Sequence, residues 1–178
     1  MPLYQQTIGS NANFGDWLQS GAGSFGAGTI ICGDVGGNDY DSCLRFTNVT
    51  IWKNAPIAKA QLEFYSDEGA GSPSILVNAN DADSPSVPAD AAAGVALVRT
   101  TAGVNMGTVT NGQVKTLNVK PIVEELIARA GWAINNSMMF IFNSQANANP
   151  NYICESGGYG VLLARLTIQT RAGGVVMF

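Results

Sequence analysis

Apolar and polar residues alternate in short stretches along this chain, and the alternation predicts β-strands. Between residues 58 and 64, one face takes small and apolar side chains and the other takes polar ones: Ala58, Ala60, Leu62 and Phe64 against Lys59, Gln61 and Glu63. Residues 162–169 repeat this pattern. Strands with one dry and one wet face are typical of antiparallel sheets, so the pattern predicts a β-sandwich.

Clusters of Gly, Asn, Pro and Ser separate the apolar runs, as in antiparallel all-β proteins. The predicted strands are Leu3–Ile8, Gly28–Cys32, Ser42–Ile51, Ala58–Tyr65, Ser74–Asn80, Thr108–Thr110, Val114–Val119, Met138–Asn143, Tyr152–Glu155 and Val161–Thr170. Residues 66–102 are expected to form long loops around one of these strands.

One short helix is predicted at about residues 121–130. Pro121 suits its first turn, an apolar stripe follows, and Gly131 ends it. The stripe is expected to cap an open end of the sandwich, with Trp132 closing the corner. Glu125 and Arg129 have the i, i+4 spacing of an exposed ion pair.

Length and composition indicate one domain over residues 1–178, with 46% apolar and only 12% charged residues. Each of the two terminal segments allows two interpretations. Residues 1–28 could be an arm on a neighbouring chain or the first strand and its loop, and residues 171–178 could be a tail docked on this domain or on a neighbour. The candidate interface residues are Phe14, Trp17, Leu18, Phe25, Val175, Val176, Met177 and Phe178.

Charge and the missing residue types exclude several functions. A net charge of −4 without a basic stripe argues against nucleic acid as a partner. No apolar run is long enough to span a membrane, and no leader peptide is visible, so we expect synthesis in the cytoplasm and no membrane partner. The chain has no histidine, which rules out Ser-His-Asp and Cys-His catalysis. We expect a protein that is not an enzyme and needs no cofactor.

Two further features leave alternatives open. Residues 33–41 and 78–83 are rich in Asp and Asn, the oxygen ligands of calcium, but they lack EF-hand spacing and suit turns better. Cys32, Cys43 and Cys154 are an odd number without CxxC spacing, so free buried thiols are expected, and a Cys32–Cys43 disulfide stays open.

Two stretches carry a family resemblance. The run YDSCLRFTNVTI at residues 40–51, followed by APIAKAQLEF at 55–64, is similar to the central strands of DNRLRE-type β-sandwich modules. The run VKPIVEELIARAGW at 119–132 and the strand MMFIF at 138–142 resemble the helix and next strand of the same modules. The resemblance implies an antiparallel jelly-roll fold, of the kind found in cell-surface proteins and in virions of tailed phages.

The resemblance implies no catalytic residues. We interpret the chain as a phage structural protein, specifically a capsid decoration (cement) protein on the capsid exterior that binds the major capsid protein and copies of itself, as a homotrimer. A tail or fibre component is an alternative within the virion. The other alternative is a carbohydrate-binding module, whose aromatic platform would draw on Trp17, Trp52 and Trp132.

Arg45 raises a local question, because it lies between Leu44 and Phe46 in a predicted strand. If those two residues face the core, Arg45 faces the other way. It is then either an architectural residue paired with Glu63 or Glu155, or a plain exposed arginine.

Overall fold

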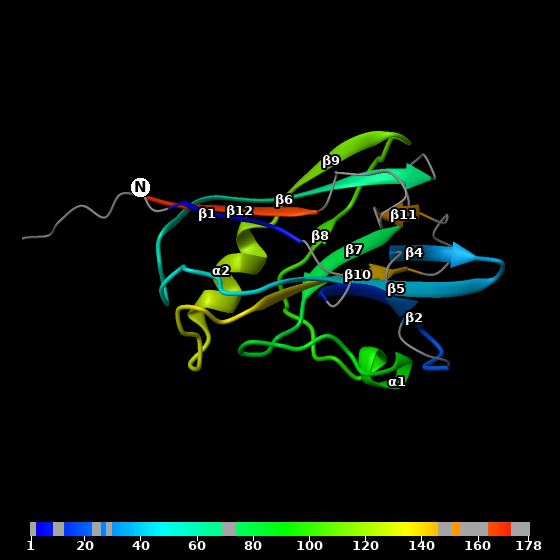
Figure 1. Ribbon diagram of the computed structural model, residues 1–178, viewed down its shortest axis with the longest axis horizontal. Coiled ribbons are helices and arrows are strands. Elements are labelled where there is room, and N and C mark those ends of the chain that lie inside the picture. Colours follow the sequence, from blue (N-terminus) through cyan, green and yellow to red (C-terminus); the bar gives the residue numbers. More distant parts are fainter. Residues whose placement is uncertain are drawn as a thin grey trace, which may run out of the picture.

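The computed structural model describes residues 3–8, 13–22, 26–27, 30–68, 74–145, 151–153 and 164–171. Two antiparallel sheets pack face to face in a jelly-roll-like sandwich (Figure 1). The first sheet contains β1 (Leu3–Thr7), β12 (Arg165–Thr170), β6 (Ile57–Glu68) and β9 (Gln113–Asn118). The second contains β2 (Phe14–Leu18), β3 (Gly26–Ala27), β4 (Ile30–Val35), β5 (Asn38–Phe46), β7 (Ile75–Ala79), β8 (Val104–Asn105) and β10 (Met138–Ser144). The short β11 (Asn151–Ile153) pairs with both β4 and β6 and joins the sheets.

The core lies between the sheets and is filled by alternate residues of the strands. In β5, Leu44 and Phe46 point inward, and the pairing with β10 places them opposite Phe140 and Met138. Phe46 meets Phe140 edge to face, with 6.0 Å between ring centroids. This arrangement confirms the predicted inward face of the Arg45 strand.

The helix α2 (Lys120–Ala128) closes one end of the sandwich (Figure 1). Its apolar stripe is buried, and the Trp132 indole N–H donates to the Ile51 carbonyl at 2.9 Å, so the cap and the corner residue are confirmed. The expected Glu125–Arg129 ion pair is wrong. The carboxylate of Glu125 instead accepts hydrogen bonds from the backbone N–H groups of residues 101 and 102, at 2.8 and 2.7 Å.

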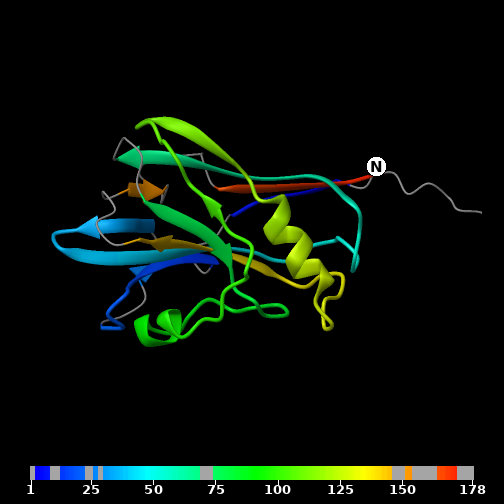
Figure 2. The ribbon, with the colours of Figure 1, turned by 180° about the vertical axis from the view of Figure 1, so that it is seen from behind.

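A second, smaller core lies on the outer face of the second sheet. There, residues 81–102, which we call the covering segment, lie over β2, β5 and β10, with α1 (Ala91–Val95) on the outside (Figures 1 and 2). The helix begins at Asp90, whose side chain accepts from the Ala93 N–H at 2.8 Å. Trp17 is packed so closely against Gly94 that a Cβ there would lie 2.6 Å from the indole ring. The sequence prediction of loops missed this helix.

Two residues of the segment 1–28, expected to be either an arm or the first strand and its loop, are buried in a strand of this chain. Phe14 and Trp17 belong to β2, which pairs with β5, and both side chains are buried within this chain. They are therefore not available to a neighbouring chain in this fold, and Leu18 is only half-buried. Phe25 and residues 175–178 lie outside the described residues.

The two described cysteines are buried on opposite faces of the second sheet. Cys32 belongs to the core between the sheets, and Cys43 belongs to the small core under the covering segment. Because the sheet lies between them, a Cys32–Cys43 disulfide is wrong for this structure. Cys154 lies outside the described residues.

Candidate functional site

A depression of about 190 Å³ opens on the outer face of the second sheet, at the edge of the covering segment. Its lining comes from four parts of the chain: Gln19 just after β2, Asp41 on β5, Asn143 on β10, and Val95 and Arg99 in the covering segment. Asp41 and Asn143 reach this face because they alternate with core residues along their strands. We call this the Asp41 depression.

Asp41 is the buried charge at the bottom of this depression, with its side chain only 2% exposed. One carboxylate oxygen accepts from the Gln19 amide at 2.7 Å and from the Ser144 N–H at 2.9 Å. The other accepts from a terminal nitrogen of Arg99 at 2.8 Å. Burial raises the pKa of Asp41, and these three donors partly oppose that rise. Because the positive charge of Arg99 balances a negative charge on Asp41, we treat the carboxyl group as the ionised half of an ion pair.

The remaining polar groups of the depression are fixed around this pair. The Arg99 side chain is 24% exposed. Its Nε donates to the Asn143 side-chain oxygen at 3.1 Å when the amide is oriented to satisfy both of its atoms. The Gln19 amide also donates to the Ser144 carbonyl at 2.6 Å. The depression is therefore preorganised by hydrogen bonds between segments that are distant in sequence.

Known catalytic arrangements do not fit the described part of the chain. Its residues contain no cluster of three or more His, Cys, Asp or Glu side chains that could hold a metal ion. In the segments 33–41 and 78–83, considered for calcium, Asp side chains bond other groups of the protein. Asp34 accepts from the Gly37 N–H within a turn, and Asp81 and Asp83 bond Arg129. The groups that line the depression are two amides, an ion pair and an apolar side chain, which can offer hydrogen bonds and apolar contact.

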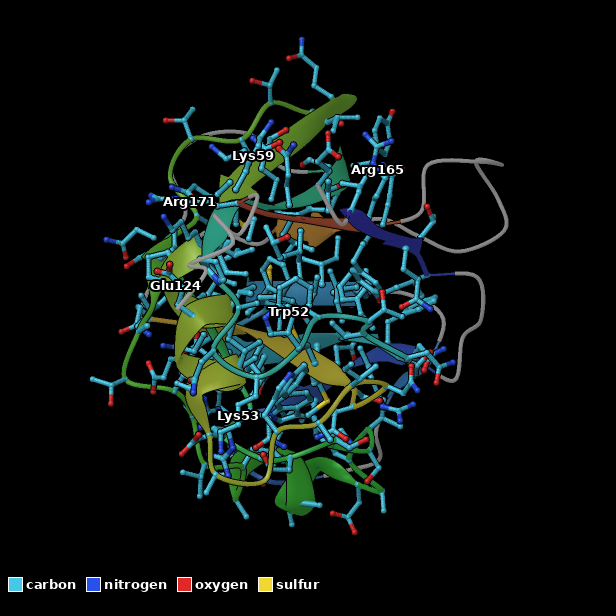
Figure 3. All side chains as sticks on the ribbon, turned by 90° about the vertical axis from the view of Figure 1, so that its left-hand side faces the viewer. Trp52, Lys53, Lys59, Glu124, Arg165 and Arg171 are labelled. Carbon is cyan, nitrogen blue, oxygen red and sulfur yellow. The ribbon has the colours of Figure 1, made fainter. Side chains whose placement is uncertain are left out.

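A second surface lies at the end of the sandwich where α2 closes it. Trp52 is 40% exposed there, in the loop between β5 and β6. The neighbouring loop carries Ile134, which is 53% exposed. Two backbone hydrogen bonds join the loops: the Asn135 N–H donates to the Val49 carbonyl, and the Val49 N–H donates to the Asn136 carbonyl, both at 2.9 Å. Figure 3 looks onto this end, with Trp52 near its centre and Lys53, Lys59, Glu124 and Arg171 around it; Arg165, also labelled, lies farther along β12, opposite Glu63. We call this surface the Trp52 end.

The structure separates the three tryptophans that a sugar platform would need. Trp17 and Trp132 are buried, and only Trp52 presents part of its ring to solvent. An aromatic platform built from all three is therefore wrong. Sequence reasoning placed Asp41 only in an oxygen-rich loop, and it did not identify Gln19, Arg99 or Asn143 as a site. Gln19 and Asn143 are 124 positions apart in the sequence, so only the folded structure brings these groups together.

Arg45 uses neither of the carboxylates considered for it. Its guanidinium donates to the Pro85 carbonyl at 2.6 Å, to the Asn13 side-chain oxygen at 3.1 Å and to the Ser137 hydroxyl at 3.1 Å. Glu63 instead pairs with Arg165 across β6 and β12 at 2.7 Å, and Glu155 lies outside the described residues. Arg45 is thus architectural, through neutral acceptors.

The fold defines an antiparallel β-sandwich, and comparisons with known proteins add little to it. The chain matches no known family, including the DNRLRE-type modules, and no curated protein. It is similar to the solved structure of a carbohydrate-binding module specific for non-crystalline cellulose (CBM28), with a TM-score of 0.35, 12% identity, and coverage of 89% of this chain and 87% of that one. A similarity this weak carries no argument about the ligand of this chain. Neither described helix is long and apolar enough to cross a membrane.

Proposed function

We propose that this chain is a non-catalytic structural domain that assembles with copies of itself and with a larger protein shell through the Trp52 end. The observation that carries the proposal is the exposed Trp52, in a loop that backbone hydrogen bonds join to the loop of the exposed Ile134. A large aromatic side chain at the centre of a surface, surrounded by charged residues, is typical of protein interfaces. The buried positions of Trp17 and Trp132 leave Trp52 as the aromatic anchor.

Charges around the Trp52 end support contact with another protein. Lys53 is held by a hydrogen bond from its ammonium group to the Ala130 carbonyl at 2.8 Å, and Glu124 pairs with Lys120 at 3.7 Å. Such rim charges contribute little affinity but select partners and their orientation. The low charge of the whole surface offers little repulsion between copies.

The finer proposal is a decoration protein of a tailed-phage head, active as a homotrimer on the capsid exterior. Its support is the resemblance of residues 40–64 and 119–142 to virion β-sandwich modules, together with a surface suited to packing. The proposed partners are the major capsid protein and copies of this chain. Neither a cofactor nor catalysis is part of the proposal.

The test is sedimentation of the purified chain and of Trp52→Ala, followed by binding to capsids that lack decoration. We expect the wild type to sediment as a trimer and Trp52→Ala to lose self-association or capsid binding while it keeps its melting temperature. Val114→Ala is the matched control, because Val114 is 51% exposed on β9, away from this end. Unchanged sedimentation and capsid binding of Trp52→Ala would refute the interface, and a wild type that stays monomeric and does not bind capsids would refute the function.

A further inference from the structure

The Asp41 depression has an electrostatic character that restricts its ligands. Its carboxylate and its guanidinium are in direct contact, with 2.8 Å between Asp41 and Arg99. An anionic ligand would be attracted by Arg99 but repelled by Asp41, and a cationic ligand would be attracted by Asp41 but repelled by Arg99. A neutral ligand that can both donate and accept hydrogen bonds avoids this conflict.

Hydrogen-bonding groups remain available at the rim of the depression. Within the described residues, the side-chain oxygen of Gln19 accepts no hydrogen bond, because only its nitrogen is used, toward Asp41 and Ser144. Arg99 uses three of its donors, toward Leu97, Asp41 and the reoriented Asn143. A guanidinium has five N–H donors, so two remain. The depression is therefore lined by an amide with one unused acceptor oxygen and by a guanidinium with two unused N–H donors.

Val95 gives the depression an apolar wall beside its polar groups. Val95 is the last residue of α1, and its side chain is 41% exposed beside these polar groups. A volume of about 190 Å³ is below the roughly 300 Å³ at which drug-sized pockets begin. One small ring fits this size better than an extended chain.

We propose that the Asp41 depression binds a single sugar ring of a neutral saccharide. A pair of adjacent hydroxyl groups would donate to the Gln19 oxygen and accept from Arg99, and the apolar C–H face of the ring would rest on Val95. Asp41 contacts no ligand in this arrangement; it positions Arg99 and Gln19. The proposal is independent of the Trp52 end, because the two surfaces share no residue.

The experiment is an NMR titration of the whole chain with neutral monosaccharides as their methyl glycosides, namely glucose, galactose, mannose and N-acetylglucosamine. We expect at least one to shift the side-chain signals of Gln19, Asn143 and Arg99 in a saturable manner. A single ring makes few contacts, so a dissociation constant of about 1–10 mM is expected. Acetate and ammonium serve as charged probes of the same site and should not saturate it.

Two valine variants separate binding from folding. Val95→Ser removes the apolar wall and leaves every hydrogen bond of the depression in place, so we expect at least about a threefold weaker affinity at an unchanged melting temperature. Val98→Ser is the control, because Val98 is exposed in the same segment but does not line the depression. The proposal is overturned if no glycoside saturates these signals, if the shifts map elsewhere, if acetate or ammonium binds more tightly, or if both variants bind as the wild type does.

Discussion

Replacing Arg45 by methionine should destabilise the fold, because this arginine connects three separate parts of the chain. Its guanidinium donates to Pro85 in the covering segment, to Asn13 just before β2 and to Ser137 just before β10. Methionine can keep the apolar contacts of the side-chain stem, but it cannot donate any of these bonds. The substitution therefore tests the hydrogen bonds with little change in packing.

The expected loss follows from the number of bonds and from their exposure. A hydrogen bond from a charged donor contributes about 1.5–3 kcal/mol, so three fully buried bonds would exceed about 4.5 kcal/mol. Arg45 is half-buried, and water can replace part of what is lost. We expect a decrease of about 2–3 kcal/mol in the free energy of unfolding, or about 5–10 °C in melting temperature for a chain of this size.

Urea unfolding followed by tryptophan fluorescence measures this loss, and Arg165→Met is the matched control. Arg165 is 46% exposed and pairs with Glu63 on the surface, so its replacement should cost at most about 1 kcal/mol. High salt should reduce the loss for Arg165→Met much more than the loss for Arg45→Met. If Arg45→Met is no less stable than Arg165→Met, Arg45 is a plain surface arginine and the reasoning above is wrong.

Three other substitutions test the fold. Gly94→Ala should cost about 1–3 kcal/mol by thermal unfolding, because the added Cβ would lie 2.6 Å from the Trp17 ring; a neutral result would mean that α1 shifts freely. Burial raises the pKa of Asp16 to about 6, so the folded chain holds this proton to higher pH than the unfolded chain and loses stability as pH rises from about 4 to about 6. Asp16→Asn should remove that loss, so at about pH 7 its free energy of unfolding in urea should exceed that of the wild type by about 2–3 kcal/mol. A wild type that is equally stable at about pH 4 and about pH 7 would contradict this. Phe46→Ala should cost about 3–5 kcal/mol in urea unfolding, against less than about 0.5 kcal/mol for Val114→Ala, and similar losses would contradict the assigned core.

Local sequence patterns predicted those parts of the fold that depend on local burial. The alternation in β6 and β12 is confirmed from Ala60 onward, although Ala58 is exposed, because the pairing with β12 shifts register near Ile57. The strand expected at Ser42–Ile51 instead runs from Asn38 to Phe46, since it continues into a tight turn with β4. At the short strand expected over Thr108–Thr110, only Val109 forms a β-bridge, and the two-residue strand β8 at Val104–Asn105 was not predicted.

The strand β2, the helix α1 and the candidate site could not be predicted locally, and the reason is physical. The strand β2 begins at Phe14 with a glycine and an aspartate in its five residues, which is a weak strand pattern, and its pairing with β5 determines it. The helix α1 has only five residues and is held by Trp17 and by the Asp90 cap rather than by propensity. Contacts between distant segments specify all of these features.

The charged residues of this chain explain how the covering segment stays on the sandwich. The chain has few charges, yet three arginines connect residues 81–102 to the rest of the fold: Arg45 bonds Pro85, Arg99 bonds Asp41, and Arg129 bonds Asp81 and Asp83.

Apolar contacts alone would hold this segment weakly, because the small core beneath it has only five fully buried residues. The arginine hydrogen bonds and ion pairs hold it in place as well, and one of them, the Arg99–Asp41 pair, also forms the floor of the depression. The order of the candidate site therefore depends on the same contacts that attach the covering segment, so an arginine lost at Arg45 or Arg129 should loosen the depression without touching it.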